Sequence, residues 1–202
     1  EYAGRYCTKF IDGVATRGWF SEDFTLAEIK TLRARERIPK TRPNNTLYND
    51  QFEIPSFAEI ITLAQHAEKE YGRKVGIYPE TKHPTYFAYE GCYQTGEAIH
   101  RCLNQALLRE LLRHGFTDPR RVFIQSFEVE NLLELRNQQM LRLGLSFPLV
   151  QLLGDMDNQF PPEQSNFSRP YDFYYHSHQK HDLDAIYGEL NTLLQITPQT
   201  HY

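Results

Sequence analysis

Hydrophobic and polar residues alternate with two different periodicities along this chain, and the change from one to the other predicts its helices and strands. Apolar residues recur every three or four positions within residues 23–32, 54–72, 96–114, 129–143 and 182–195, which is the period of an amphipathic helix. Denser apolar runs lie within residues 74–82, 121–127 and 148–154 and are typical of strands in a buried parallel sheet. Helices alternating with three strands predict an α/β fold with right-handed crossovers.

Two of the predicted helices begin at recognisable capping boxes. Thr25 is followed by Glu28, and Ser56 is followed by Glu59, so each hydroxyl and each carboxylate can satisfy a free backbone N–H group. Gly72 ends the second of these helices, in the position where glycine commonly closes a helix.

The segments between the periodic stretches are predicted to be loops. Residues 1–22 contain three glycines and no clear period, residues 33–53 are basic and rich in turn-forming residues, and residues 155–182 are polar and aromatic. The basic side chains of 33–53 could attract an anionic substrate, but a solvated loop is the interpretation that its composition favours. The three histidines of 155–182 (His176, His178 and His181) could bind a metal, although such a tract is a poor ligand cage.

Glu80 and Lys82 are the main candidates for chemistry. They follow an apolar run that ends at Pro79, and residues two apart in an extended segment project to the same face. A carboxylate in that position can bind a hard cation, and a neighbouring ammonium can bind a phosphate oxygen. A solvated surface ion pair would look the same in the sequence, and by spacing alone it is the commoner outcome.

Three further polar residues lie in or beside the predicted strands. Gln125 and Gln151 each sit among apolar residues, so each amide either satisfies a neighbouring group or faces a ligand. His83 lies just beyond a strand's carboxyl end, where α/β folds place their chemistry, and a functional role for it is the less favoured of two interpretations.

Composition limits the range of partners. The 202 residues suit one domain, and a net charge of −4 without a block of lysine or arginine argues against nucleic acid. No apolar run approaches the roughly 18 residues that a membrane helix needs. Cys7, Cys92 and Cys102 are too few and too irregular for structural zinc, and one disulfide with one free thiol stays open.

Several stretches resemble one enzyme family. Residues 23–30, 54–59 and 76–82, the last reading Gly-Ile-Tyr-Pro-Glu-Thr-Lys, are similar to the glycerophosphodiester phosphodiesterase family and in particular to its bacterial periplasmic members. Residues 123–127 and 149–152 resemble the next two strands of the same family. The likeness runs in order through nearly the whole chain, and residues 78–82 are its most specific part.

The resemblance implies a TIM-type (β/α)8 barrel that cleaves glycerophosphodiesters to sn-glycerol 3-phosphate and an alcohol. It implies a divalent cation, Ca²⁺ or Mg²⁺, with Glu80 as a metal ligand and Lys82 as a catalytic residue that faces the phosphate. Phe127 and Gln151 would bind substrate near the cleft. It also implies a periplasmic or secreted location, whereas the head group and the oligomeric state stay open.

The chain departs from the family pattern at both ends. The family has a His-Arg-Gly sequence, a Glu-x-Asp metal pair and a second catalytic histidine, and none of these occurs in the 202 residues. An eight-stranded barrel also needs about 250 residues. We therefore expect residues 1–202 to be the middle units of a barrel and inactive alone. The alternatives are a non-catalytic phosphodiester-binding module and a related phospholipase D-like activity on lysophospholipids.

Overall fold

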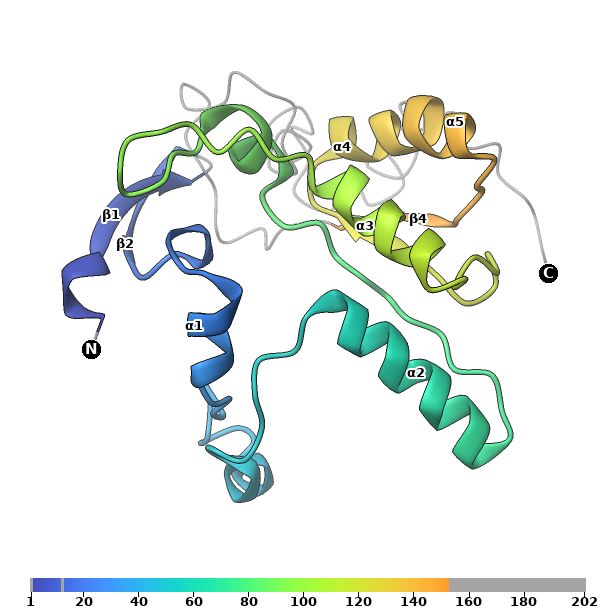
Figure 1. Cartoon of the computed structure of the whole chain (residues 1–202), viewed down its shortest axis with the longest axis horizontal. Coiled ribbons are helices and arrows are strands. Elements are labelled where there is room, and N and C mark those ends of the chain that lie inside the picture. The colour runs from blue at the N-terminus through green and yellow to red at the C-terminus, as the bar shows by residue number, and fades with distance from the viewer. Residues whose placement is uncertain (1, 12, 153–202) are drawn as a thin grey trace, which may run out of the picture.

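A computed structural model describes residues 2–11 and 13–152. The described chain begins with a short helix, a β-hairpin and further short helices. Longer helices then pack near a small parallel sheet (Figure 1). Its elements are η1 (Ala3–Arg5), β1 (Cys7–Ile11), β2 (Val14–Gly18), η2 (Ser21–Asp23), α1 (Leu26–Thr31), η3 (Pro43–Tyr48), α2 (Phe57–Tyr71), η4 (Tyr86–Glu90), α3 (Leu103–Arg113), β3 (Ile124–Ser126), α4 (Val129–Glu134), η5 (Leu135–Met140), α5 (Leu141–Leu143) and β4 (Leu149–Gln151).

The prediction of a loop for residues 1–22 is wrong. Strands β1 and β2 pair antiparallel, with Cys7 opposite Gly18 and Ile11 opposite Val14. Gly13 has φ +77°, a conformation that glycine adopts without steric cost. The Asp12-Gly13 sequence between the strands is a strong hairpin signal, and treating that glycine as an interruption concealed it.

Both predicted capping boxes are confirmed, and each glutamate also joins its helix to an earlier element. Glu28 caps α1 together with Thr25 and accepts two hydrogen bonds from Arg5, at 2.6 and 2.9 Å. Glu59 caps α2 and lies 2.5 Å from Lys30 of α1. The hydrogen bond from Arg5, with the capping bonds, lowers the pKa of Glu28 to about 2, so this carboxylate stays charged at neutral pH.

The helix expected at 96–114 is shorter than its apolar period indicated. It begins at Leu103, because residues 92–98 form a turn that is closed by an antiparallel bridge between Cys92 and Ala98. Gly96 has φ +87° within this turn. Leu107, Leu108 and Leu111 are buried as the period predicted. The helix expected at 129–143 is confirmed as the continuous run of α4, η5 and α5, which contains a π-helical segment.

The three predicted strands are only partly formed. β3 and β4 pair in parallel, but the 74–82 segment joins β3 only through isolated parallel bridges at Ile77 and Glu80. The described residues therefore make a mixed α/β structure without a closed barrel. The loop and helix expected over 155–182 and 182–195, with their three histidines, lie outside the described residues.

One face of this sheet carries the hydrophobic core. Val122 and Ile124 are fully buried against the helices, whereas Phe123 between them keeps 41% of its surface exposed. The core joins residues from α2, α3, β3 and the α4–α5 run: Ile61, Ala64, Leu107, Leu108, Leu111, Phe116, Val122, Ile124, Val129, Leu132, Leu135, Met140 and Phe147. Across residues 2–11 and 13–152, no helix combines the length and the hydrophobicity that crossing a membrane requires.

Replacing Leu111 by alanine tests whether α3 anchors this core. Leu111 is fully buried, so Leu111→Ala removes packed methyl groups and leaves a cavity. We expect it to lower the free energy of unfolding by about 2–5 kcal/mol in urea titrations of the complete protein. Leu112→Ala is the matched control, because Leu112 is 40% exposed on the same helix and should lose much less. Equal losses in the two variants would contradict the placement of α3.

Candidate functional site

The site is built on the backbone of residues 76–82, which lies beside β3. Ile77 N–H donates to Arg121 O at 2.7 Å, Phe123 N–H donates to Ile77 O at 3.1 Å, and Gln125 N–H donates to Pro79 O at 2.9 Å. Thr81 N–H continues the pattern with a 3.0 Å bond to Gln125 O. This alternating pattern is that of a parallel ladder, so Glu80 lies level with Gln125 at the carboxyl end of the sheet.

Gly76 permits this close pairing. A Cβ atom at that position would lie 2.9 Å from the carbonyl oxygen of Arg121, which is closer than real Cβ contacts allow. Any larger residue would push the 74–82 segment away from β3. Glycine is therefore required here by the approach of a second backbone.

Glu80 and Lys82 both point to the exposed face of this segment, and Thr81 between them is buried. This alternation follows from extended backbone, in which successive side chains point to opposite faces. The structure therefore brings the carboxylate and the ammonium to one surface at a strand end. Their roles in binding metal and phosphate stay predictions.

Thr81 fixes the backbone that carries the pair. Its hydroxyl accepts a hydrogen bond of 2.7 Å from Asn131 Nδ2, and its carbonyl accepts one of 3.2 Å from Ser126 Oγ. Ser126 Oγ in turn accepts from Glu128 N–H at 3.2 Å. The buried side of the segment is thus tied both to the end of β3 and to α4, which limits how far Glu80 and Lys82 can move.

An aromatic surface lies next to the pair on the same exposed face. The Tyr78 and Phe123 rings meet edge to face, with 6.4 Å between their centroids. Phe127 lies four residues after Phe123, so alternation along extended backbone places it on the same side of the chain, and it is half-buried. Aromatic and apolar side chains therefore border one side of the Glu80–Lys82 surface.

The two glutamines occupy different positions. Gln125 lies opposite Val150 in the sheet, on the Glu80 side, and is half-buried. Gln151 lies opposite Ser126, and its Nε2 donates to the carbonyl oxygens of Phe127 and Leu152 at 2.8 Å each. Of the two interpretations left open by the sequence, Gln151 satisfies neighbouring backbone groups here, and substrate contact by Gln151 and Phe127 stays a prediction.

The loop after Lys82 starts in a strained conformation. His83 has φ +58°, which is uncommon for a residue other than glycine and is frequent at functional sites. The chain then turns into the π-helical η4, whose Tyr86 is buried and donates a 2.6 Å hydrogen bond to Glu22. The loop is therefore tied to the N-terminal part of the chain.

A buried ionic cluster makes this connection. Lys9 Nζ lies 2.9 Å from Glu22 and 2.8 Å from Asp23, and it donates to the carbonyl oxygen of Cys92 at 2.9 Å. The side chains of Lys9, Glu22 and Asp23 keep only 7%, 6% and 2% of their surface exposed. Lys9 of the hairpin and Glu22 of η2 thus hold the two ends of the segment 86–92 through charge-assisted hydrogen bonds.

The cluster shifts the titration of its members. Burial raises the pKa of Tyr86 well above its usual range, and its hydrogen bond to Glu22 adds to that effect. Burial by itself would lower the pKa of Lys9, but hydrogen bonds to Asp23 and Glu22 outweigh it and leave the pKa raised. Lys9 is therefore protonated and Tyr86 is neutral at physiological pH, as this arrangement of charges requires.

Glu80 fits a divalent cation as one oxygen ligand among several, because carboxylates suit Ca²⁺ and Mg²⁺. Within the described ranges, however, no three histidine, cysteine or acidic side chains lie close enough together to hold a metal ion. The three cysteines, Cys7, Cys92 and Cys102, are free thiols.

Comparison with known protein families shows which family this chain belongs to. The model of the glycerophosphoryl diester phosphodiesterase family matches residues 9–183, which is most of the sequence. The chain belongs to this family. Membership implies a TIM-barrel fold of which the chain is a part, and proteins of the glycerophosphoryl diester phosphodiesterase family generally depend on a metal ion.

Individual relatives come from plants and bacteria. The chain is 32% identical over 145 residues to glycerophosphodiester phosphodiesterase GDPD6 of Arabidopsis thaliana, and 32% identical over 146 residues to a glycerophosphodiester phosphodiesterase of Haemophilus influenzae. It is 24% identical over 152 residues to the Treponema pallidum enzyme of that name. These alignments cover 68%, 67% and 71% of the chain but only 36%, 37% and 40% of the relatives.

The glycerophosphoryl diester phosphodiesterase family is therefore established, whereas the periplasmic subtype stays a prediction. The roles of Glu80 and Lys82 stay predictions. The sequence did not indicate the buried residues around them, namely Thr81 and Asn131 behind the strand end and the Lys9 cluster that holds the following loop. The adjacent acidic residues Glu22 and Asp23 gave no sign of their partner, because Lys9 lies on the far side of a hairpin that was not predicted.

Replacing Lys9 by methionine tests the buried cluster. Lys9→Met leaves two buried carboxylates without their cation, so we expect the free energy of unfolding to fall by about 3–5 kcal/mol. Urea titration of the complete protein at neutral pH measures this. Lys40→Met changes an exposed lysine of the 33–53 loop and should alter stability by less than about 0.5 kcal/mol. A loss in Lys9→Met no larger than in that control would show that the cluster is not buried.

Proposed function

We propose that the complete protein hydrolyses glycerophosphodiesters to sn-glycerol 3-phosphate and an alcohol. The observation that carries the proposal is the pair formed by Glu80 and Lys82, side by side on the exposed face at a strand's carboxyl end, in a chain of this family. The three relatives are named as enzymes that act on this class of substrate. Because the chain spans just over a third of their length, the activity is proposed for the whole protein.

Lys82 is proposed to bind the phosphodiester. Its exposed ammonium carries three donors and a full positive charge, so it can hold a non-bridging phosphate oxygen and stabilise the charge that gathers there during hydrolysis. The hydrogen bonds to Thr81 hold the backbone on its N-terminal side and therefore fix the base of the side chain.

Glu80 is proposed to supply one oxygen ligand to a divalent cation, Ca²⁺ or Mg²⁺. A bound cation would act as a Lewis acid on the phosphodiester. The other ligands would come from parts of the protein beyond the described residues. Glu80 itself projects toward the same surface as Lys82, so a cation on the carboxylate and a phosphate oxygen on the ammonium would lie on one side of the strand end.

The remaining proposals follow from family membership. Residues 1–202 would form a part of one (β/α)8 barrel domain, and Phe127 and Gln151 would lie near the substrate. A periplasmic or secreted location is likewise proposed from the resemblance alone.

Glu80→Gln tests the proposed metal ligand. Loss of the negative charge should weaken cation binding and reduce kcat/KM for glycerophosphocholine about 100-fold or more. The control is Glu97→Gln, which changes an exposed glutamate in the turn before α3. Steady-state rates of the complete enzyme are measured over a range of calcium and magnesium concentrations. A wild-type rate with wild-type dependence on the cation would overturn the assignment of Glu80.

Lys82→Ala tests the proposed phosphate contact. Removing one charged hydrogen bond should lower kcat/KM by about 10- to 150-fold. Lys69→Ala removes an exposed lysine of α2, outside the strand end that carries Lys82, and should leave the rate unchanged. Kinetics of Lys82→Ala that match the wild type at low substrate would rule out the contact.

The same assays separate the two alternative functions. A complete protein that binds glycerophosphocholine but does not hydrolyse it would be the non-catalytic module. Faster turnover of lysophosphatidylcholine than of glycerophosphocholine would instead indicate the phospholipase D-like activity.

A further inference from the structure

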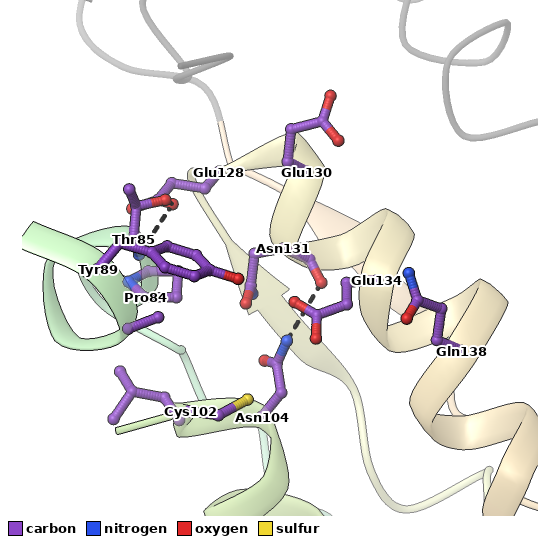
Figure 2. Close-up of a pocket in the computed structure, with 12 residues that line it drawn as sticks. Pro84, Thr85, Tyr89, Cys102, Asn104, Glu128, Glu130, Asn131, Glu134 and Gln138 are labelled. Carbon is purple, nitrogen blue, oxygen red and sulfur yellow. Dashed lines mark hydrogen bonds between the residues drawn. The ribbon is translucent and has the colours of Figure 1, made fainter. Parts of the chain in front are cut away.

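A pocket lies where the first turns of α3 and α4 face the loop after Lys82 (Figure 2). Its volume is about 330 Å³, which is enough for a small organic molecule. Its walls come from three separate segments, and its lining residues include Thr85 and Tyr89 from the loop and η4, Cys102 and Asn104 from the start of α3, and Asn131 from α4.

The charge of this pocket has one sign. Glu128, Glu130 and Glu134 all line it, and no lysine, arginine or histidine does so among the described residues. Glu128 is already bonded by the N–H group and the hydroxyl of Thr85, so the negative charge open to a ligand comes from Glu130 and Glu134. The N-terminus of α3, which has no side-chain cap, contributes only about half a positive charge, and these two carboxylates outweigh it. The pocket therefore favours a positively charged ligand over an anion.

Asn104 supplies an independent sign of a missing ligand. Its side chain is only 1% exposed, and its Nδ2 donates to the carbonyl oxygen of Asn131 at 3.3 Å, whereas its Oδ1 is buried and accepts no hydrogen bond. Figure 2 shows the amide among the lining side chains, with its nitrogen turned to Asn131 and its oxygen turned the other way. A buried acceptor without a donor is unfavourable, and a bound donor would remove that cost.

A second buried acceptor without a donor belongs to Gln139, which contacts two lining residues of the pocket. Gln139 donates through Nε2 to Glu134 at 2.5 Å and to the Cys102 sulfur at 3.5 Å, but its own Oε1 is buried and accepts no bond. Its amide holds the Glu134 carboxylate in place at the edge of the pocket. Two buried amide oxygens in this part of the structure, Asn104 Oδ1 and Gln139 Oε1, thus lack a donor.

We propose that this pocket binds a small protonated primary amine. An ammonium group brings the positive charge that the glutamates favour and the N–H donors that Asn104 Oδ1 lacks. A quaternary ammonium ion has the charge but no N–H group, so it cannot satisfy Asn104. A metal ion is disfavoured, because no three acidic, histidine or cysteine side chains in the described ranges are close enough to hold one.

This amine pocket is separate from the Glu80–Lys82 surface. Thr81 points to the buried side of the strand and meets Asn131, a lining residue of the pocket, whereas Glu80 and Lys82 point to the exposed side. The proposal therefore does not rest on the proposed function. An Asn131–Thr81 hydrogen bond of 2.7 Å joins the two places.

Calorimetric titration of the complete protein with ethylammonium chloride at low ionic strength tests the proposal. We expect saturable binding with a Kd on the order of 1 mM, since three heavy atoms at about −1.5 kcal/mol each set the limit. Tetramethylammonium chloride should bind at least about tenfold more weakly, because it offers no hydrogen-bond donor. No saturable binding of ethylammonium, or equal affinity for the two cations, would overturn the proposal.

Variants locate the binding. Glu134→Gln and Asn104→Leu should each weaken ethylammonium binding about tenfold or more, through loss of charge and of the acceptor respectively. Glu70→Gln, on the exposed side of α2, is the matched control and should bind as the wild type does. If Asn104→Leu does not fold, Glu134→Gln and Glu130→Gln decide the question, and unchanged affinity in both would refute the assignment of this pocket.

Discussion

The parallel pairing between residues 76–81 and β3 is the interaction on which the rest of this structure depends. Its bonds run from Ile77 to Thr81, and they exist because Gly76 lets two backbones approach to a distance that any Cβ would prevent. The pairing determines which residues face the helices and which face outward. It thereby buries Thr81 and presents Glu80 and Lys82 on the opposite side. The site is thus a consequence of strand alternation at one strand end.

Polar contacts connect the N-terminal part of the chain to this sheet. Phe20 is the only buried hydrophobic residue described before α2, so apolar packing contributes little there. Instead, Glu28 and Glu59 each cap a helix and bind a basic side chain from an earlier element, Arg5 and Lys30 respectively. Lys9 joins the hairpin to the segment that follows Lys82. Such contacts are directional, so they fix orientation as well as proximity.

A small group of buried polar side chains lies behind the strand end that carries Glu80 and Lys82. Asn131 donates to Thr81 on the strand and accepts from Asn104 on α3, and Ser126 joins the strand end to the start of α4. These residues form a connected hydrogen-bond network between the Glu80–Lys82 backbone and the amine pocket. In a low-dielectric interior each member of such a network matters, because a lost partner leaves a buried polar group unsatisfied.

Local sequence was sufficient for the elements whose signals are local. The capping boxes at Thr25 and Ser56, the glycine stop at Gly72 and the long helix over 129–143 depend on neighbours within one turn, and the structure contains all of them. The same-face placement of Glu80 and Lys82 also follows from their spacing alone. The start of α3 was misjudged, because residues 92–98 pair across a turn that the apolar period does not reveal.

Tertiary structure alone decided the partners of these elements. Nothing near Lys9 in the sequence indicates that its ammonium meets Glu22, Asp23 and the carbonyl of Cys92, and nothing near Asn131 indicates Thr81. Such contacts join residues up to 83 positions apart and depend on how the hairpin, the sheet and the helices pack together. The sequence by itself therefore determined the two capped helices, the helical run over 129–143, the strand end and the family. Packing determined what holds the site in place, because hydrogen-bond partners distant in sequence are chosen by geometry.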